Sequence, residues 1–432
     1  MPTSGVLRLP EFRSYLGFRG LMTFGLQMQA VVIGYHLYAI TKDPLALGLI
    51  GLAEAVPAIS SALYAGHVAD RSEKRGLLRL VTICMALLAV GIGWAHYAAE
   101  AHSLTSGQYQ GAIYAFIFLG GIARGFYSPA GSSLLGLLVP RTEYAQATAW
   151  SSMTWQAATV LGPTLGGFVY DGLGPIGAQG VVLGCLLTAW LVVGGVGHRP
   201  PSALAGVSES VAESIRQGLR FVRSQRLLLG AISLDMLSVF FGGAVALLPI
   251  YAQDILHVGA DGLGMLRAAD AVGSVATMYV LTRVGAFARP WRALLIAVAG
   301  FGCTIIGFGL SSNFYLSLAW LVALGCFDAV SVVIRSTLMQ TLTPDHMRGR
   351  VSSISSIFVA SSNEIGSFES GFTARLMGTV PATIFGGCMT LGIVSLFSLL
   401  KTKGQARVGA QTQPTMAAAV AEEEREKDPP TA

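Results

Sequence analysis

Long apolar stretches, each about as long as a bilayer crossing, constrain this chain more than any other feature. There are twelve, near residues 15–40, 45–68, 77–98, 109–137, 146–169, 176–196, 228–251, 260–283, 292–310, 314–340, 351–377 and 380–400. A helical crossing of the hydrocarbon core takes roughly 20 residues. Only 12% of the 432 residues are charged, against roughly 25% in a typical soluble domain. The sequence therefore predicts an all-α membrane protein with twelve transmembrane helices.

The basic residues between the stretches predict how the chain is oriented. If the amino terminus lies inside, nearly all loop arginines and lysines fall on the inner side, and the outer loops hold only Lys42. Basic loops resist translocation and stay in the cytoplasm. We therefore expect both termini to be cytoplasmic and the chain to lie in the plasma membrane, the inner membrane in a bacterium.

An internal repeat predicts the domain organisation. Residues from Gly121 to Gly167 align with residues from Gly325 to Gly371 at a constant offset of 204 residues. This offset superimposes the fourth and fifth stretches on the tenth and eleventh, which indicates two parallel six-helix halves. The predicted units are a first half (1–197), a cytoplasmic linker with an amphipathic helix (198–226), a second half (227–402) and a disordered acidic tail (403–432).

Two motifs lie where helices turn or pack closely. Gly66, Asp70, Arg71 and Arg75 form a G-x-x-x-D-R-x-x-x-R pattern at the turn after the second stretch. The fifth stretch contains a second pattern, formed by Gly162, Pro163, Gly166 and Gly167. Glycines allow close helix contacts, and a proline bends a helix. Both motifs are therefore predicted to serve conformational change.

These motifs resemble those of the major facilitator superfamily, and the second resembles the signature of its proton-coupled exporters. The stretch from Gly325 to Gly371, with Leu234 and Asp235, is similar to the enterobactin-exporter branch; Asp270 departs from it, where proline is expected. The resemblance implies secondary active transport by alternating access. It suggests export of a siderophore or an amphiphilic drug in exchange for protons, by a monomer in a lipid bilayer.

Other classes of function are weakly supported or stay open. No Walker-type G-K-S/T occurs, and the cysteines lack metal-ligand spacing. We therefore expect no enzyme activity, cofactor, metal or nucleic-acid partner. The alternatives that remain are an uncoupled facilitator or importer of the same fold, and a membrane sensor that transports nothing.

Ionisable groups inside the stretches are the candidates for mechanism, because each costs at least roughly 2.5 to 3.5 kcal/mol at the bilayer centre. The resemblance places the first, fourth, seventh and tenth helices around a cavity. The eleventh stretch adds two further acids. The proton-coupling candidates are Asp235, Asp328 and Glu364, and the substrate-cavity candidates are Arg19, Arg124, Arg335 and Glu369.

The same charges also allow a purely structural interpretation. Arg124 could form a fixed pair with Asp328 or Glu364 that holds the halves together. Asp328 and Arg335 share a helix face but lie about 10 Å apart along the axis, at 1.5 Å per residue, and cannot pair directly. We expect Glu54, and Arg267 with Asp270, to serve packing or local ion pairs.

Overall fold

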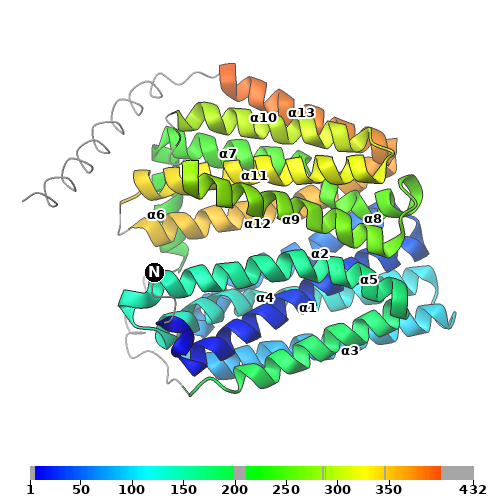
Figure 1. The fold of residues 1–432 in the computed structure, drawn as a ribbon, viewed down its shortest axis with the longest axis horizontal. Helices are drawn as coiled ribbons and strands as arrows, with labels where there is room; N and C mark the ends of the chain where they lie inside the picture. The colour runs from blue at the N-terminus through cyan, green and yellow to red at the C-terminus, as the bar shows by residue number, and fades with distance from the viewer. Residues whose placement is uncertain (1–4, 199–210, 285–286, 288, 345–346, 400–432) are drawn as a thin grey trace, which may run out of the picture.

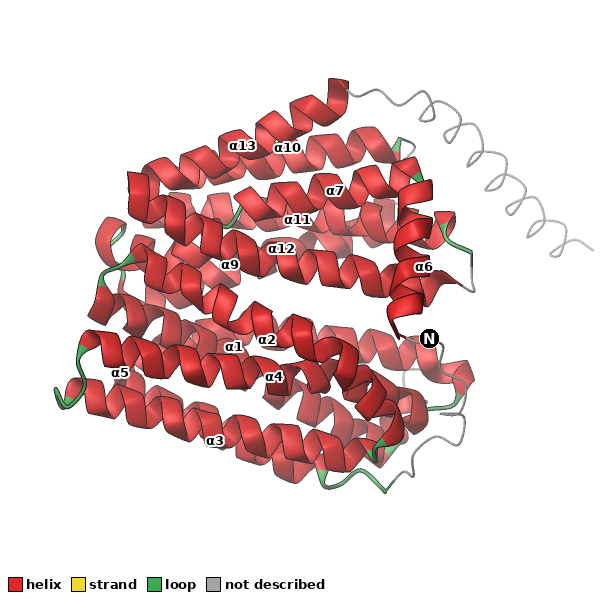
Figure 2. Ribbon diagram, turned by 180° about the vertical axis from the view of Figure 1, so that it is seen from behind, coloured by secondary structure: helices red, strands yellow, loops and turns green. Residues whose placement is uncertain are grey.

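The computed structural model describes residues 5–198, 211–284, 287, 289–344 and 347–399, which form helices and no strand (Figure 2). The main helices are α1 (Pro10–Thr41), α2 (Pro44–Arg71), α3 (Lys74–Glu100), α4 (Ser106–Leu138), α5 (Tyr144–Val193), α6 (Val211–Ser224), α7 (Arg226–Phe241), α8 (Leu248–Ile250), α9 (Gly259–Val284), α10 (Pro290–Gly309), α11 (Phe314–Leu342), α12 (Arg348–Met377) and α13 (Thr379–Leu399). Short helical turns are η1 (Val6–Arg8), η2 (Arg141–Glu143), η3 (Ala244–Leu247) and η4 (Tyr251–Ile255).

These helices make twelve crossings, as the sequence predicts. The long run of α5 contains two of them, because Gly174 breaks it with φ 69° and ψ −179°. The seventh crossing runs from α7 through η3, α8 and η4. Nine helical segments of the described residues are long and apolar enough to span a membrane, with the broken seventh crossing counted as one segment. Helices α9 and α12 are not among these nine, and the two crossings within α5 are counted as one. The predicted twelve-helix fold is confirmed.

The two halves form two layers of nearly parallel helices (Figure 1). In the first half, α1, α3, α4 and α5 share an apolar core that includes Phe18, Met22 and Leu134. In the second half, α7, α10, α11 and α13 pack around Leu234, Leu294 and Ile334. We call the end of the bundle where α1 begins the inner end and the opposite one the outer end, after the predicted orientation.

The seventh crossing is not one continuous helix. Helix α7 ends at Phe241, and Gly242 and Gly243 follow before the chain resumes as η3. A Cβ on Gly243 would lie 2.7 Å from the carbonyl oxygen of Gly366 on α12. Two glycines weaken the helix and let the backbones of two helices meet. The break therefore places the outer part of this crossing against α12.

Glycine-mediated contacts join the halves in two equivalent places. On one side, Gly167 of α5 abuts the carbonyl oxygen of Ala260 at the start of α9. On the other, Gly371 of α12 lies against α2, where its Cβ would be 2.8 Å from the carbonyl oxygen of Pro44. Gly167 and Gly371 are equivalent positions of the internal repeat. The repeat thus produces two matching crossings between the halves, α5 with α9 and α2 with α12.

The other glycines of the fifth-stretch motif face α1. A Cβ on Gly162 would lie 2.9 Å from the carbonyl oxygen of Phe24, and one on Gly166 would lie 3.0 Å from Cγ of Met28. The carbonyl oxygen of Pro163 lies 2.7 Å from the Cβ position of Gly264 on α9. One motif therefore packs α5 both within its own half and against the other half.

The linker helix α6 crosses the inner end of the bundle at a steep angle to the other helices (Figure 2). Its described part runs from Val211 to Ser224, and Val222 packs with Leu228 and Val351. It therefore docks on the second half through α7 and α12. The predicted segments 199–210 and 403–432 lie outside the described residues.

At the inner turn, α2 ends at Arg71, and Glu73 caps α3 by accepting a hydrogen bond from the Gly76 amide at 2.5 Å. Arg75 lies in the first turn of α3. The surroundings of Gly66 and of the Asp70 side chain lie outside the described part.

A valine at position 167 should weaken the outer contacts between the halves. Its side chain would overlap the carbonyl oxygen of Ala260 and press on Asp261, whose Cα lies 3.1 Å from the Cβ position. Overpacking costs about 1–3 kcal/mol. We therefore place a cysteine at Gln29, in the cavity between the halves, and add an impermeant maleimide from outside. In the Gly167→Val variant this cysteine should react at least about fivefold faster than in the same protein with Gly167.

The matched control is Gly180→Val, since no atom lies within 4 Å of the Cβ position of Gly180. Equal labelling rates in the two variants would show that the α5–α9 crossing does not hold the outer side closed.

Candidate functional site

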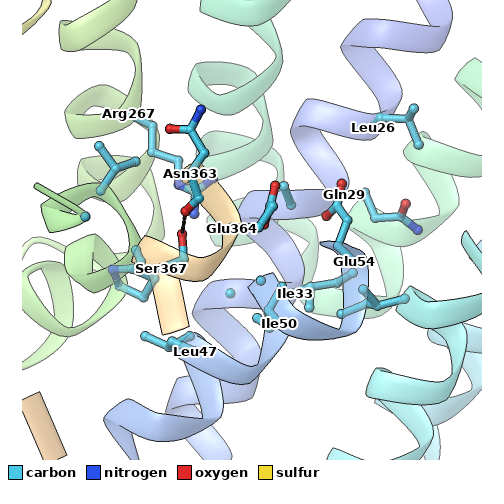
Figure 3. A pocket seen from close by; sticks show the side chains of 18 of the residues that line it. Leu26, Gln29, Ile33, Leu47, Ile50, Glu54, Arg267, Asn363, Glu364 and Ser367 are labelled. Atoms are coloured by element: carbon cyan, nitrogen blue, oxygen red, sulfur yellow. Dashed lines mark hydrogen bonds between the residues drawn. The ribbon is translucent and has the colours of Figure 1, made fainter. Parts of the chain in front are cut away.

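A cavity of about 430 Å³ lies between the two halves. Helices from both halves line it, and its apolar wall includes Ile33, Leu47 and Ile50 (Figure 3). Its charged lining residues are Glu54, Arg124, Arg267, Asp270, Asp328 and Glu364. Small-molecule sites in proteins typically occupy roughly 300–1,000 Å³ and combine apolar walls with a few polar groups. The cavity therefore has the size and composition of such a site.

On the side of the first half, Arg124 of α4 forms an ion pair with Glu54 of α2. The two helices meet closely here, because a Cβ on Gly121 would lie 2.8 Å from the carbonyl oxygen of Glu54. Arg124, three residues further along α4, then reaches the Glu54 carboxylate. The expectation that Arg124 pairs with Asp328 or Glu364 is therefore corrected: its closest partner lies in its own half.

Glu364 of α12 faces this pair from the second half. It projects toward the side of the cavity where Gln29 and Glu54 lie (Figure 3). Its carboxylate interacts electrostatically with Arg124, and it lies close to the α2 backbone, since a Cβ on Gly51 would be 3.3 Å from Oε2. Arg124 thus lies between an acid of its own half and one of the other half.

A second ion pair lies within the second half. Arg335 of α11 contacts Asp235 of α7, with Nη1 2.6 Å from Oδ2, and the side chains are only 12% and 5% exposed. The Ser331 hydroxyl donates to the same aspartate at 3.4 Å. Arg335 and Asp235 are therefore sequestered beside the cavity, and neither lines it.

The other predicted site residues also fall into two groups, those that line the cavity and those that do not. Asp328, Arg124 and Glu364 line the cavity, whereas Arg19 and Glu369 do not. Arg19 interacts with Tyr127 inside the first half. The Glu369 carboxylate accepts a hydrogen bond from the Thr373 hydroxyl at 2.9 Å. Both side chains are thus engaged within their own half.

The predicted local pair of Arg267 and Asp270 on α9 does not form. Neither residue takes part in an ion pair of the described residues, and the buried atoms Nε of Arg267 and Oδ1 of Asp270 have no hydrogen-bond partner. The Arg267 guanidinium instead extends toward α1, where a Cβ on Gly34 would be 3.8 Å from Nη2. The sequence analysis did not predict that Glu54, Arg267 and Asp270 line the cavity.

Polar contacts between the halves close the outer end. Nζ of Lys42 lies 3.0 Å from Oδ1 of Asp254, and Nη1 of Arg375 lies 3.2 Å from Oδ2 of Asp43. The Gln253 amide donates to the carbonyl oxygen of Tyr35 at 2.8 Å. Beneath them an apolar cluster joins Val31, Tyr38 and Leu47 to Leu247, Tyr251 and Phe308. The only signal in the sequence was Lys42, the single basic residue of the outer loops.

Two repeat-related six-helix halves around a charged cavity define a membrane transporter of the alternating-access architecture. The profile of the Major Facilitator Superfamily matches residues 17–367, and the chain belongs to this family. It is therefore an integral membrane transporter, and the members of its family are not enzymes.

Among curated relatives, the chain is similar to the enterobactin exporter EntS of Escherichia coli strain SMS-3-5, with 24% identity over 415 residues and 95% of each chain covered. It is 24% identical over 395 residues to EntS of Citrobacter koseri, covering 90% of this chain and 91% of that protein. A solved bacterial homologue of the iron transporter ferroportin, in an inward-facing state, shares the fold with a TM-score of 0.68 at 14% identity, over 91% of this chain and all of the other.

Removing one partner of the Arg124–Glu54 pair should destabilise the first half. Glu54→Gln leaves Arg124 with Glu364 alone. Breaking a buried pair costs 3–5 kcal/mol and an exposed pair at most about 1. Because these side chains are 34% and 26% exposed, we expect a loss of about 1–2 kcal/mol, measured as a lower melting temperature of the purified protein in detergent.

The double variant Glu54→Gln/Arg124→Gln should recover part of this loss, because it also removes the arginine that has lost its closest partner. Glu100→Gln, at the exposed end of α3, is the control. A single variant as stable as the wild type would contradict the assignment of this pair.

Proposed function

We propose that this protein exports a small organic molecule by alternating access, in exchange for protons. The observation that carries the proposal is the charged cavity enclosed between repeat-related halves, with acids from the second half facing Arg124 of the first. The curated relatives named above are enterobactin exporters. A siderophore or an amphiphilic drug is therefore the proposed substrate class.

The outer contacts support an alternating-access cycle. Lys42, Asp43 and Tyr35 belong to the first half, and their partners Asp254, Arg375 and Gln253 belong to the second. Exposed ion pairs contribute at most about 1 kcal/mol each, so they can break in every cycle. In this state the outer side is closed, and we propose that substrate enters the cavity from the inner side.

A carboxylate at the cavity is the proposed proton carrier. Burial favours the protonated form of a carboxyl group, and a nearby arginine favours the ionised form. Glu364 meets Arg124 across the interface between the halves, so a rocking motion would change its surroundings. Glu364 and Asp328 line the cavity and are the first candidates. Asp235, already paired with Arg335, is the third.

We also propose that both termini lie in the cytoplasm, that the protein resides in the plasma membrane, the inner membrane in a bacterium, and that it works as a monomer. The basic inner loops support the orientation.

Amide variants in proteoliposomes test this function. With enterobactin, and in parallel ethidium, as probes, we expect wild-type protein to move at least one of them uphill when a pH gradient is imposed. Replacing the true carrier in Glu364→Gln, Asp328→Asn or Asp235→Asn should reduce uphill transport to the background of protein-free liposomes. Exchange of labelled for unlabelled probe should persist, because exchange needs no net proton movement.

Asp171→Asn, an exposed acid at the outer end, is the matched control. Transport that is insensitive to collapse of the pH gradient would indicate a facilitator or importer. No movement of either probe would favour a sensor and contradict the proposal.

A further inference from the structure

We infer that Asp270 and Asp328 act as one proton-binding unit on the second-half side of the cavity, sharing a single proton while the outer end is closed. This inference rests on the proposed function only for the use of that proton. It adds Asp270 to the residues of coupling, a position that the sequence had suggested for local packing.

The internal repeat reveals where this unit lies. Helix α4 corresponds to α11 at an offset of 204 residues, so that Gly121 matches Gly325 and Arg124 matches Asp328. Helix α2 corresponds to α9 at an offset of 216 residues, which matches Glu54 with Asp270. The structure supports this second offset, because Gly121 packs on the backbone oxygen of Glu54 and Gly325 packs on that of Asp270.

The contact of α2 with α4 in the first half and the equivalent contact of α9 with α11 in the second half hold different charges. In the first half the crossing positions hold an arginine and a glutamate, which form an ion pair. In the second half the same two positions hold two aspartates. The contact of α2 with α4 therefore joins opposite charges, whereas the contact of α9 with α11 brings two acids together.

The two aspartates are close neighbours. A Cβ on Gly325 would lie 2.8 Å from Oδ1 of Asp270, and Asp328 follows Gly325 by three residues, which places it on the same face of α11. Both side chains line the cavity, and their carboxylates interact electrostatically. Oδ1 of Asp270 is buried and has no hydrogen-bond partner among the described residues.

The nearby cations are directed elsewhere. Arg267, on the same helix as Asp270, extends toward Gly34 of α1. Arg335 interacts with Asp328 at longer range, but its Nη1 lies 2.6 Å from Asp235. On the remaining sides, Glu364 adds another acid from α12, and Arg124 contacts Glu54. Among the described residues, the two aspartates therefore have no close cationic partner.

Two carboxylates that lie side by side in a poorly solvated site do not both ionise readily, because their charges repel. The usual outcome is that one proton is shared and that the pair titrates as a unit. In this structure a shared proton would also supply the donor that Oδ1 of Asp270 lacks. The geometry thus calls for a proton between α9 and α11, two helices of the second half that line the cavity.

Infrared spectroscopy of the purified full-length protein tests the unit without any substrate. The readout is the carbonyl band of protonated carboxylic acids, followed in a pH titration and compared between wild type and variants. In Asp270→Asn and in Asp328→Asn, the remaining acid has lost the other member of the pair, while Asp235 stays paired with Arg335. We expect its band to disappear at a pH about one unit or more below the wild-type midpoint, a tenfold weaker proton affinity.

The double variant should lack the component of this band that titrates at the wild-type midpoint, and the exposed control Asp171→Asn should leave that component unchanged. Asp270→Glu keeps the second acid and should retain the wild-type midpoint within a fraction of a unit, which separates loss of charge from a packing defect. Midpoints in both single variants equal to that of the wild type would overturn the inference.

The transport assay separates this result from the proposed function. If Asp270→Asn and Asp328→Asn each abolish pH-driven transport, and the double variant loses no more, the pair acts as one unit. If Asp270→Asn transports normally while Asp328→Asn does not, proton coupling stands and the shared unit is wrong. If wild-type protein shows the shared band but transports neither probe, the unit exists and the proposed function fails.

Discussion

The close backbone contacts between α5 and α9 and between α2 and α12 are the interactions on which the rest of the structure depends. Gly167 against Ala260 and Gly371 against Pro44 bring the halves together without intervening side chains. Such contacts are sensitive to a single methyl group, because packed interfaces deform little. They fix the outer end, and with it the position of the cavity, whose walls include residues of α2, α9 and α12.

Within this frame the two halves distribute charge unequally. The first half presents Arg124 with its own counter-ion Glu54. The second half keeps one neutral pair, Arg335 with Asp235, beside the cavity and presents three acids and one arginine to it, namely Asp270, Asp328, Glu364 and Arg267. A relative movement of the halves therefore changes the surroundings of acids on one side more than those of the arginine on the other. This asymmetry is the physical basis of the proton coupling that we propose.

The sequence predicted the crossings and the two halves, because hydropathy and the glycine repeat can be recognised in the sequence itself. It did not predict which way the charged groups face. It also did not predict that Arg124 pairs with Glu54, since the approach of α4 to α2 at Gly121 is a tertiary feature. The outer contacts, such as Lys42 with Asp254, join residues far apart in the chain. The sequence analysis did not connect Asp270 with Asp328. That relation becomes visible only once Glu54, the equivalent position of the repeat, is found paired with Arg124.

The measurement that tests the central claim most directly is the distance between spin labels across the halves at each end of the bundle. Gly172 and Leu310 are exposed near the outer end, and Thr142 and Thr341 are exposed near the inner end. In proteoliposomes, a change of pH should lengthen the outer distances while it shortens the inner ones, as expected if the halves rock about the cavity. Outer and inner distances that stay fixed, or that lengthen together, would contradict alternating access by this protein.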